Sequence, residues 1–314
     1  MRSSNIGGQA VMEGIMMKHK DDYAVAVRKP NGEIVVDKKT YHSFVGEGKS
    51  LTKIPFVRGV FNFADSLILG IRTLMYSATF FEEEEDVELT EEEAAKKAKE
   101  EKKMLTGTVA LSIVLAIGIF MVPPYFLSVW LSRWTDSYNV ITLVEGFVRI
   151  AIFLIYIALI SRMEDIQRTF MYHGAEHKCI NCIEHGLALN VKNVRESSRQ
   201  HKRCGTSFLF FVMLISLCLL FIVRAKSHLM RIVIRIVLLP VIAGISYEVL
   251  RLAGRSDNPI INAVSKPGLA IQNMTTKEPD DSMIEVAIKA VEAVFDWRSY
   301  EMEVFGKISG EEDS

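Results

Sequence analysis

The sequence predicts an α-helical membrane protein with about four transmembrane helices and a small cytoplasmic α+β cap, containing a β-hairpin, that the N- and C-terminal regions form together. The first observation is that 49% of the 314 residues are hydrophobic although 24% are charged, and that the apolar residues gather in blocks. The second is block length. Four blocks, at about 105–131, 140–160, 206–223 and 232–250, hold roughly 18 to 27 residues each, which is enough to cross the hydrocarbon core of a bilayer.

Charge and cysteine usage argue against two other classes of protein. The net charge of −1 leaves no global basic field, so we expect no direct sequence-specific nucleic-acid binding. The four cysteines are absent from both terminal regions, which does not fit the disulfide framework of a secreted domain. Residues 1–8 lack the apolar stretch of a cleaved signal peptide, so internal segments are expected to direct membrane insertion.

Residues 1–54 are predicted to form a small β unit. Residues 23–27 and 34–36 are β-prone, and the Pro-Asn-Gly turn at 30–32 predicts a hairpin between them, because Asn and Gly tolerate positive φ. The glycine-rich stretch 7–14 could supply a third strand, with glycines where another backbone comes close.

Residues 55–81 have a helical, mostly apolar pattern that carries one narrow polar stripe. The stripe would be costly against lipid, which favours a helix lying in the membrane interface; a helix buried under the transmembrane bundle or in a soluble core is the alternative. The stripe consists of Arg58, Asn62, Asp65 and Arg72.

Residues 82–103 are predicted to form a charged helical linker, and residues 104–255 the membrane domain. The linker is acidic first and then rich in lysine. Pairs such as Glu92/Lys96 have the favourable i,i+4 order, so we expect a solvated helix that acts as a spacer.

Proline and charge inside the predicted spans need a separate explanation. Pro123 and Pro124 should kink the first helix or end it early. Glu145 and Arg149 are one helical turn apart in the second span, and Arg235 lies near the same level in the fourth. Because an unpaired charge is costly at membrane depth, we interpret Glu145 and Arg149 as a structural ion pair, with a polar groove or transport path as the alternative.

The connecting loops predict the orientation of the chain in the membrane. Basic residues are concentrated in the loop 161–205, whereas the first connecting loop carries only Arg133. The positive-inside rule therefore places both termini and the loop 161–205 in the cytoplasm. Arg224, Lys226 and Arg231 in the short third loop oppose this assignment but are outnumbered.

Residues 256–314 are predicted to be a cytoplasmic C-terminal segment. Pro259, Pro267 and Gly268 are expected to break a loop that runs to residue 276. The stretch 279–282 then caps an amphipathic helix, for which the N-terminal β unit is the expected partner. The apolar face of this helix consists of Ile284, Ile288, Val291 and Phe295.

The loop between the second and third spans holds the candidate site. His173, Glu176 and His177 form an HxxEH pattern, and residues four apart share one face of a helix, so both imidazoles can reach one ion. We therefore predict a divalent metal ion, with zinc as the candidate, on His173 and His177, and Glu176 as general base for a metal-bound water. Imidazoles that only donate hydrogen bonds at the membrane surface are the alternative.

Neighbouring side chains could complete the ligand set. In a reducing cytoplasm, clustered cysteine and histidine point to metal more than to disulfides. Cys179 and Cys182 could contribute to a closed structural zinc site, or they could be small apolar packing residues. The further candidate ligands are Glu184, His185, His201 and Cys204.

Several long stretches resemble the YqhQ-like family of bacterial membrane proteins, and the resemblance covers nearly the whole chain. It implies a multi-span protein of the bacterial plasma membrane that is often labelled a predicted metal-dependent enzyme. The stretches are GGQAVMEGIMMK, PFVRGVFNFADSLILG, YHGAEHK, RCGTSF, LPVIAGISYE and NMTTKEPDDSMIEVAI.

The family pattern maps onto this chain with two departures. The family often has HPRCGT where this chain has Lys202 in place of the proline, and the CxxC of Cys179 and Cys182 is not a family feature. The resemblance thus implies His173, His177 and one further ligand. That ligand is Glu184, His201 or Cys204. The matching positions are His173, Glu176, His177, Lys178, Glu184, His201, Arg203, Cys204 and Gly205.

Three functions are compatible with these features. The first is a metal-dependent hydrolase at the cytoplasmic face, in which Lys178 and Arg203 bind an anionic substrate group or the transition-state charge. The second is a non-enzymatic factor for membrane-protein insertion or assembly, associated with the translocon or the ribosome. The third is an oligomeric transporter, which no internal repeat supports. The lipid bilayer is an expected partner throughout, and a homo-oligomer is compatible with each.

Overall fold

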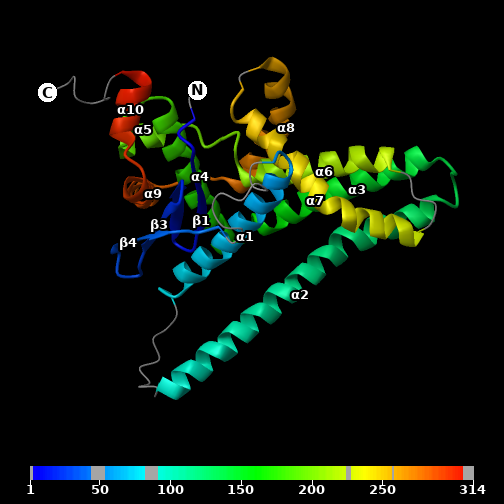
Figure 1. The fold of residues 1–314 in the computed structure, drawn as a ribbon, viewed down its shortest axis with the longest axis horizontal. Coiled ribbons are helices and arrows are strands. Elements are labelled where there is room, and N and C mark those ends of the chain that lie inside the picture. Colours follow the sequence, from blue (N-terminus) through cyan, green and yellow to red (C-terminus); the bar gives the residue numbers. More distant parts are fainter. Residues whose placement is uncertain (1–2, 44–53, 82–90, 224–227, 257, 307–314) are drawn as a thin grey trace. The chain divides into compact units, whose positions relative to one another are not determined.

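The computed structural model describes residues 3–43, 54–81, 91–223, 228–256 and 258–306, apart from some side chains near the starts of two helices (Figure 1). Four strands precede ten helices in these ranges. The chain divides into two compact units. The larger unit consists of residues 1–81, 157–216 and 224–314, and the smaller of residues 82–156 and 217–223.

The larger unit contains a four-stranded antiparallel sheet with its strands in sequence order. The strands are β1 (Ile6–Val11), β2 (Gly14–His19), β3 (Asp22–Arg28) and β4 (Ile34–Thr40). The predicted hairpin is confirmed by β3 and β4, whose turn contains Gly32 at φ 87°. β1 confirms the third strand. β2 was not predicted, because its sequence Gly-Ile-Met-Met-Lys-His lacks the alternation of a half-buried strand.

Helices cover both faces of the sheet, because successive side chains of a strand point to opposite sides. Ala24 and Ala26 of β3 face a core shared with α4 (Glu164–Glu184) and α9 (Asp281–Val294). Val25 faces the opposite core, which includes Leu69 of α1 (Val57–Ala78).

The predicted C-terminal amphipathic helix is confirmed in α9. The Asp280 carboxylate caps it by accepting a hydrogen bond from the Met283 N–H at 3.0 Å. Ile284 and Val291 are fully buried, and α9 packs on β2, β3 and β4. The N-terminal sheet is therefore the partner of this helix.

The helix predicted for residues 55–81 is confirmed in α1. Its N-terminal half crosses α7 (His228–Ala253), where Gly59 and Gly244 allow close approach. A Cβ atom at Gly244 would lie only 2.5 Å from the carbonyl oxygen of Phe56. The C-terminal half packs under the sheet, so α1 joins the sheet to a candidate membrane span.

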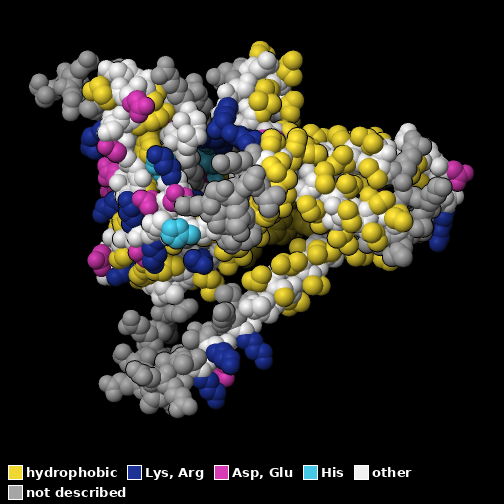
Figure 2. All heavy atoms as spheres, viewed as in Figure 1, with side chains coloured by type: hydrophobic (Ala, Val, Ile, Leu, Met, Phe, Trp, Pro, Cys, Tyr) yellow, Lys and Arg dark blue, Asp and Glu magenta, His cyan; other side chains and the backbone are white. Residues whose placement is uncertain are grey.

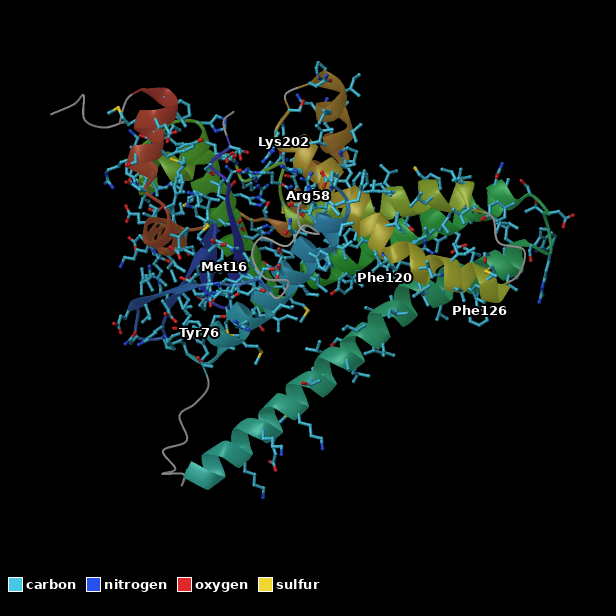
Figure 3. All side chains as sticks on the ribbon, in the orientation of Figure 1. Met16, Arg58, Tyr76, Phe120, Phe126 and Lys202 are labelled. Carbon is cyan, nitrogen blue, oxygen red and sulfur yellow. The ribbon has the colours of Figure 1, made fainter. Side chains whose placement is uncertain are left out.

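Three members of the polar stripe of α1 bond to other parts of the protein, and Figure 3 labels the first of them, Arg58. Arg58 forms an ion pair with Glu248 at 2.5 Å, Asn62 donates to the Tyr247 hydroxyl at 2.8 Å, and Asp65 accepts from the Tyr41 hydroxyl at 2.9 Å. A different face of α1 leaves apolar side chains exposed, which fits a helix at the membrane interface. These side chains are Phe63, Leu67, Ile68, Leu74 and Met75.

Four helices are long and apolar enough to cross a membrane, which confirms the predicted class of protein. The candidate spans are Thr106–Leu131, Tyr138–Ile160, Gly205–Ile222 and Ile236–Ala253. They belong to α2 (Glu91–Leu131), α3 (Tyr138–Ile160), α6 (Gly205–Ile222) and α7. Figure 2 shows hydrophobic side chains covering these helices.

The predicted linker is described only from residue 91, where it continues as a helix into the first span. Residues 82–90, the side chain of Glu92 and the side chain of Arg235 lie outside the described part of the chain. Glu145 and Arg149 form the expected ion pair at 2.9 Å, and Glu145 is buried. Their pairing favours the structural interpretation over a transport path.

Of the two effects expected of Pro123 and Pro124, a kink or an early end, the early end was wrong, because α2 continues through both to Leu131. Proline at position 124 leaves the carbonyl of Phe120 without its helical donor. The Arg149 Nε–H donates to that carbonyl at 3.4 Å. The freed acceptor is therefore bonded by a neighbouring helix, as membrane helices commonly require.

The expected loop before residue 276 is instead a helix, α8 (Pro259–Thr275). Pro259 stands at the start, where its missing N–H costs nothing, and the Asn258 side chain caps the helix by accepting from the Ile260 N–H at 2.9 Å. Pro267 is tolerated inside it. Two shorter helices complete the fold, α5 (Val191–Glu196) and α10 (Trp297–Phe305).

Candidate metal centre

The HxxEH pattern lies on α4, and almost every residue of its second half is buried. Glu164 and Asp165 in the first turn place negative charge at the helix N-terminus, where the helix dipole favours it. The apolar face packs on β1, β2 and α9. The opposite face carries His173 and His177, one turn apart as predicted, with ring centroids 4.4 Å apart.

Main-chain carbonyls orient both imidazoles. The Nδ1 atom of His173 lies 2.9 Å from the carbonyl oxygen of Thr275, and the Nδ1 atom of His177 lies 2.6 Å from that of Arg199. A carbonyl oxygen only accepts hydrogen bonds, so each Nδ1 carries a proton and donates it. The Nε2 atoms are therefore the ones available to bind a ligand, the arrangement that metal-binding histidines show.

Cys204, the residue that precedes α6, places a third candidate ligand atom beside the two imidazoles. Its Sγ lies 3.3 Å from Nε2 of His173, and one ligand atom from each of His173, His177 and Cys204 lies within 4.8 Å of the others. Two imidazole nitrogens and one thiolate sulfur are ligands that zinc prefers. Among the residues that the structure describes, these three side chains form the group that could hold a metal ion.

The charges of Cys204 and His173 are linked. Burial opposes charge on both groups, but the imidazolium of His173 and its hydrogen bond hold the pKa of the Cys204 thiol well below its usual range. Burial likewise disfavours charge on His173, yet the Cys204 thiolate raises the pKa of that imidazole to about 9. Without an ion, each group therefore favours the charged form of the other. An ion bound here would displace the proton.

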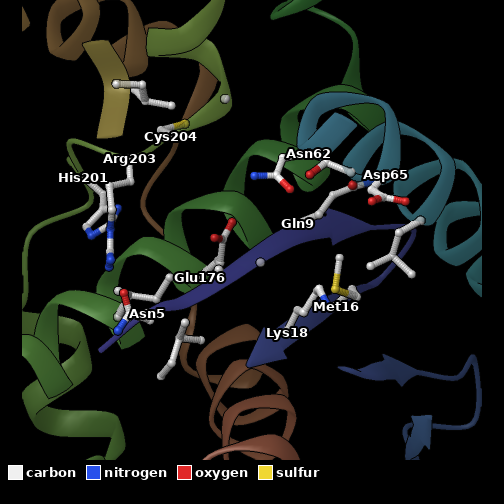
Figure 4. A pocket seen from close by; sticks show the side chains of 18 of the residues that line it. Asn5, Gln9, Met16, Lys18, Asn62, Asp65, Glu176, His201, Arg203 and Cys204 are labelled. Carbon is white, nitrogen blue, oxygen red and sulfur yellow. The ribbon is translucent and has the colours of Figure 1, made fainter. Parts of the chain in front are cut away.

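Glu176 projects from α4 into a cavity beside β1 (Figure 4). Complete burial raises its pKa, although nearby His177 and His173 oppose the rise. The Gly8 N–H of β1 donates a hydrogen bond to its carboxylate. Glu176 is not a member of the three-residue ligand cluster, so it is free to act on a group held in the cavity.

The cavity has a volume of about 690 Å³ and lies entirely in the larger unit. All three cluster residues and Glu176 line it. Its walls come from β1, β2, α1, α4 and the end of α7. An ion on the cluster would therefore keep an open side toward a space of the size of a small-molecule site.

Glu184 and His201, two of the predicted ligands, form a separate buried group. Glu184 accepts hydrogen bonds from the Ser4 N–H at 2.8 Å and the Ser4 hydroxyl at 2.9 Å, and it is also bonded by Arg203. His201 Nε2 lies 3.5 Å from the second Glu184 oxygen. The candidate third ligand is therefore Cys204, with Glu184 and His201 beside the centre.

Lys178 does not line the cavity. Its ammonium donates to the carbonyls of Arg195 and Ser197 at 2.8 and 2.9 Å and pairs with Glu278 at 2.9 Å. Lys178 is therefore not positioned to bind an anion in the cavity, whereas Arg203 lines the cavity.

The CxxC cysteines lie in the core shared by the sheet, α4 and α9. Cys179 and Cys182 are fully buried, and the Cys182 thiol bonds to the carbonyls of Leu187 and Ala188. Their burial favours the interpretation as small packing residues over a closed zinc site on this pair. His185 bonds to the Asn181 carbonyl and stands outside the cluster.

Sequence reasoning missed the residues that hold the cluster in place. Asn181 donates to the carbonyls of Ser198 and Gln200 at 2.6 and 2.9 Å, and so fixes the segment that orients His177. Gln272 of α8 bonds to both backbone groups of His201. Asn181 stands four residues after His177, so the extended polar stripe on one helix face was the signal available for it.

The comparisons with known proteins identify the family. The family described as "Protein of unknown function (DUF1385)" matches residues 54–297. The chain belongs to this family. It is also 35% identical over 288 residues to the "Uncharacterized protein YqhQ" of Bacillus subtilis (strain 168), which covers 90% of each chain. The resemblance seen in the sequence motifs is thereby confirmed.

No solved structure matches the chain. The DUF1385 range includes all three residues of the cluster and Glu176 but begins after β1.

Proposed function

We propose that the protein is a membrane-embedded, metal-dependent hydrolase whose ion, zinc as the first candidate, is held by His173, His177 and Cys204. One observation carries the proposal. Both histidines donate their Nδ1–H groups to main-chain carbonyls, which leaves their Nε2 atoms for a ligand, and one ligand atom each from His173, His177 and Cys204 lies within 4.8 Å of the others. Three protein ligands and one open position are the pattern of catalytic rather than structural zinc sites.

A zinc ion bound here would supply Lewis-acid chemistry. Zinc with three protein ligands lowers the pKa of a bound water to about 7 and polarises a carbonyl oxygen. The residues of this chain supply the rest. Thr275 and Arg199 hold the imidazole rings, and the buried setting of the cavity strengthens each electrostatic interaction.

Glu176 is the candidate general base. It follows the pattern predicted from the sequence, stands next to His177 and faces the cavity. Burial raises its pKa, so a carboxylate here has more affinity for a proton than one in water. The Gly8 N–H holds the carboxylate in position, and Arg203 is the cavity cation closest in sequence to the ligand Cys204.

The first experiment is elemental analysis of the full-length protein purified in detergent. We expect about one zinc per chain in the wild type and none in His173→Ala/His177→Ala. His185→Ala should keep the zinc, because His185 lies outside the cluster. Metal-free wild-type protein would contradict the proposal. If Cys204 of that metal-free protein were alkylated at neutral pH, a thiolate–imidazolium pair of Cys204 and His173 would be the better candidate for chemistry.

For location, we propose the bacterial plasma membrane with both termini and the loop 161–205 in the cytoplasm. The excess of basic residues in that loop supports the orientation. Contact with lipid is supported by the four apolar helices.

An insertion or assembly factor is the second candidate function. The observation that favours it is the exposure of the first span, of which only 6% is buried within the described residues. Such a helix has its surface available for another membrane protein, a translocon component or a second copy of the chain, as well as for lipid. Insertion defects in cells without the protein, rescued by His173→Ala/His177→Ala, would support this function, and failure to co-purify any membrane or ribosomal protein would contradict it.

A further inference from the structure

One end of the cavity is rich in arginine. Arg203, Arg251 and Arg255 all line it. Arg203 packs directly on the end of α7, where a Cβ atom at Gly254 would lie 2.3 Å from its Cγ atom. Figure 2 shows Lys and Arg side chains gathered beside a hollow in this face of the molecule. Arg203 is paired with Glu184. The charges of the other two arginines, Arg251 in α7 and Arg255 just after it, remain to be explained.

The carboxylate that pairs with Arg251 has a second arginine as a closer partner. Glu248 pairs with Arg58 at 2.5 Å, while its distance to Arg251 is 3.9 Å. Arg255 is exposed and has no ion pair with any residue that the structure describes. Among the residues that the structure describes, positive charge is therefore in excess at this end of the cavity.

The same end coincides with the ends of two candidate membrane spans. Gly205 is the first residue of the span Gly205–Ile222, and Leu250 and Arg251 stand near the end of the span Ile236–Ala253. All three residues line the cavity. A molecule bound there would lie at the boundary between hydrocarbon and water.

Five aliphatic side chains line the cavity among mostly polar ones. They come from the sheet, α1, α4 and α7, so a bound molecule meets both an arginine-rich end and an apolar surface. A small hydrophilic anion would use only the first. These side chains are Ile6, Met16, Leu69, Ile180 and Leu250.

We propose that the cavity binds an anionic lipid, with its phosphate group held by Arg251 and Arg255 and its hydrocarbon part against the aliphatic side chains. Guanidinium groups bind phosphate through paired, charge-assisted hydrogen bonds, and a bilayer presents phosphate at the level of the span ends. The inference rests on the proposed function and names its substrate class. Hydrolysis of an ester bond in such a lipid consumes one water and yields an acid and an alcohol.

The test compares two short-chain lipids on the full-length protein in detergent. Dioctanoyl phosphatidic acid and dioctanoyl phosphatidylcholine share the same chains and differ in net charge. We expect the wild type to prefer the acid, and Arg251→Gln/Arg255→Gln to lose roughly tenfold of that preference, as expected for losing one or two charge-assisted hydrogen bonds. The control Arg298→Gln, an arginine of α10 stacked on Trp297, should keep it.

Three outcomes would overturn the inference. These are equal affinity for the two lipids, a preference unchanged in the double arginine variant, and inorganic phosphate binding as tightly as phosphatidic acid, which would show a site for free phosphate. Metal content separates this test from the previous one. An arginine-dependent preference in metal-free protein would refute the hydrolase alone, whereas stoichiometric metal without the preference would refute only the lipid.

Discussion

Single carboxylates of this protein behave differently according to the donors around them. Glu184 and Glu176 are both buried on α4. Arg203, Ser4 and His201 surround Glu184 with donors, whereas Glu176 has the Gly8 N–H and an open cavity. The first is therefore held as a charge that stabilises the fold, and the second keeps the proton affinity that a base requires.

We expect Glu184→Gln to remove a contribution to the free energy of unfolding that the wild type loses at acid pH. Burial alone would raise the pKa of Glu184, but the hydrogen bond with His201 and the charge of Arg203 lower it from 4.5 to about 2. Since the folded pKa lies below the unfolded one, this stabilisation is complete above about pH 4.5 and is lost as the pH falls toward about 2. It amounts to at most roughly 3 kcal/mol.

Unfolding of the wild type and the variant between about pH 3 and pH 7 measures the effect. The wild type should lose stability below about pH 4.5 more steeply than Glu184→Gln. Glu303→Gln, at an exposed position of α10, should follow the wild type. Parallel curves for wild type and Glu184→Gln would refute the assignment.

Gly8→Ala should destabilise the protein and disturb Glu176. A Cβ atom at position 8 would lie 2.8 Å from the Met16 carbonyl oxygen and 2.9 Å from Glu176 Cγ. We expect a loss of about 1–3 kcal/mol, as for overpacking in a core. Gly7→Ala is the matched control, because a Cβ atom there meets nothing within 4 Å. Equal melting temperatures for the two variants would contradict the close approach of β1 to α4.

At the scale of elements, α4 is a helix with two different tasks. Its apolar face builds the core with the sheet and α9, and its polar face carries the candidate ligands. Lys178 and Asn181 add a third contribution, because they tie the connection between α5 and α6 to the same helix. The orientation of His177 thus depends on a segment that follows it by about twenty residues.

Asn181→Ala should weaken metal binding without removing a ligand. The variant frees the carbonyls of Ser198 and Gln200, and with them the neighbouring carbonyl of Arg199 that orients His177. A loss of roughly 10–100-fold in zinc affinity is expected for a residue that supports a ligand. Competition with a chelator measures it. Asn193→Ala, whose amide holds the carbonyl of Ala188 instead, should leave the affinity within about twofold.

Gly244→Ala should disrupt the crossing of α1 and α7. The added methyl would lie 2.5 Å from the carbonyl oxygen of Phe56, a backbone atom that cannot move without shifting α1. We expect a cost of about 1–3 kcal/mol in thermal unfolding. Gly118→Ala in α2, with nothing within 4 Å, should be neutral or stabilising by up to about 1 kcal/mol. A tolerated Gly244→Ala would contradict this packing.

At the scale of the whole molecule, four candidate spans would place both termini on one side of the membrane. We propose that this side is the cytoplasm, because basic residues are concentrated in the loop 161–205. Fusions of a reporter that is active only in the cytoplasm measure this. We expect activity at either terminus and none at a fusion after Arg133, in the loop between α2 and α3. Activity at the termini and at Arg133 alike would mean that one candidate span does not cross.

The sequence allowed prediction wherever one element decided the outcome. Block length predicted the spans, the Asn-Gly turn predicted the β3–β4 hairpin, and the Asp280 cap predicted α9. Prediction failed where the deciding contact lies elsewhere in the chain. α8 forms despite Pro267, and α2 continues past Pro124 with the freed carbonyl bonded by Arg149.

The candidate site follows the same rule. The spacing of His173 and His177 was sufficient to pair them, because both stand on one helix. The third ligand stayed open among Glu184, His201 and Cys204, since only the folded chain shows which of them faces the imidazoles. The groups that orient the imidazoles, the carbonyls of Thr275 and Arg199, are main-chain acceptors, which side-chain identity does not reveal.

The contacts around the centre also set an order of events during synthesis. Glu184 is bonded by Ser4, Glu176 by Gly8 and His173 by Thr275, so the centre needs both the N-terminal segment and the end of α8. A ribosome must therefore translate all four spans, and α8 after them, before the last carbonyl reaches His173. During this time the core between the N-terminal strands and α9 is incomplete, because α9 is translated after α8. The candidate site is therefore completed only after the four candidate spans have been synthesised.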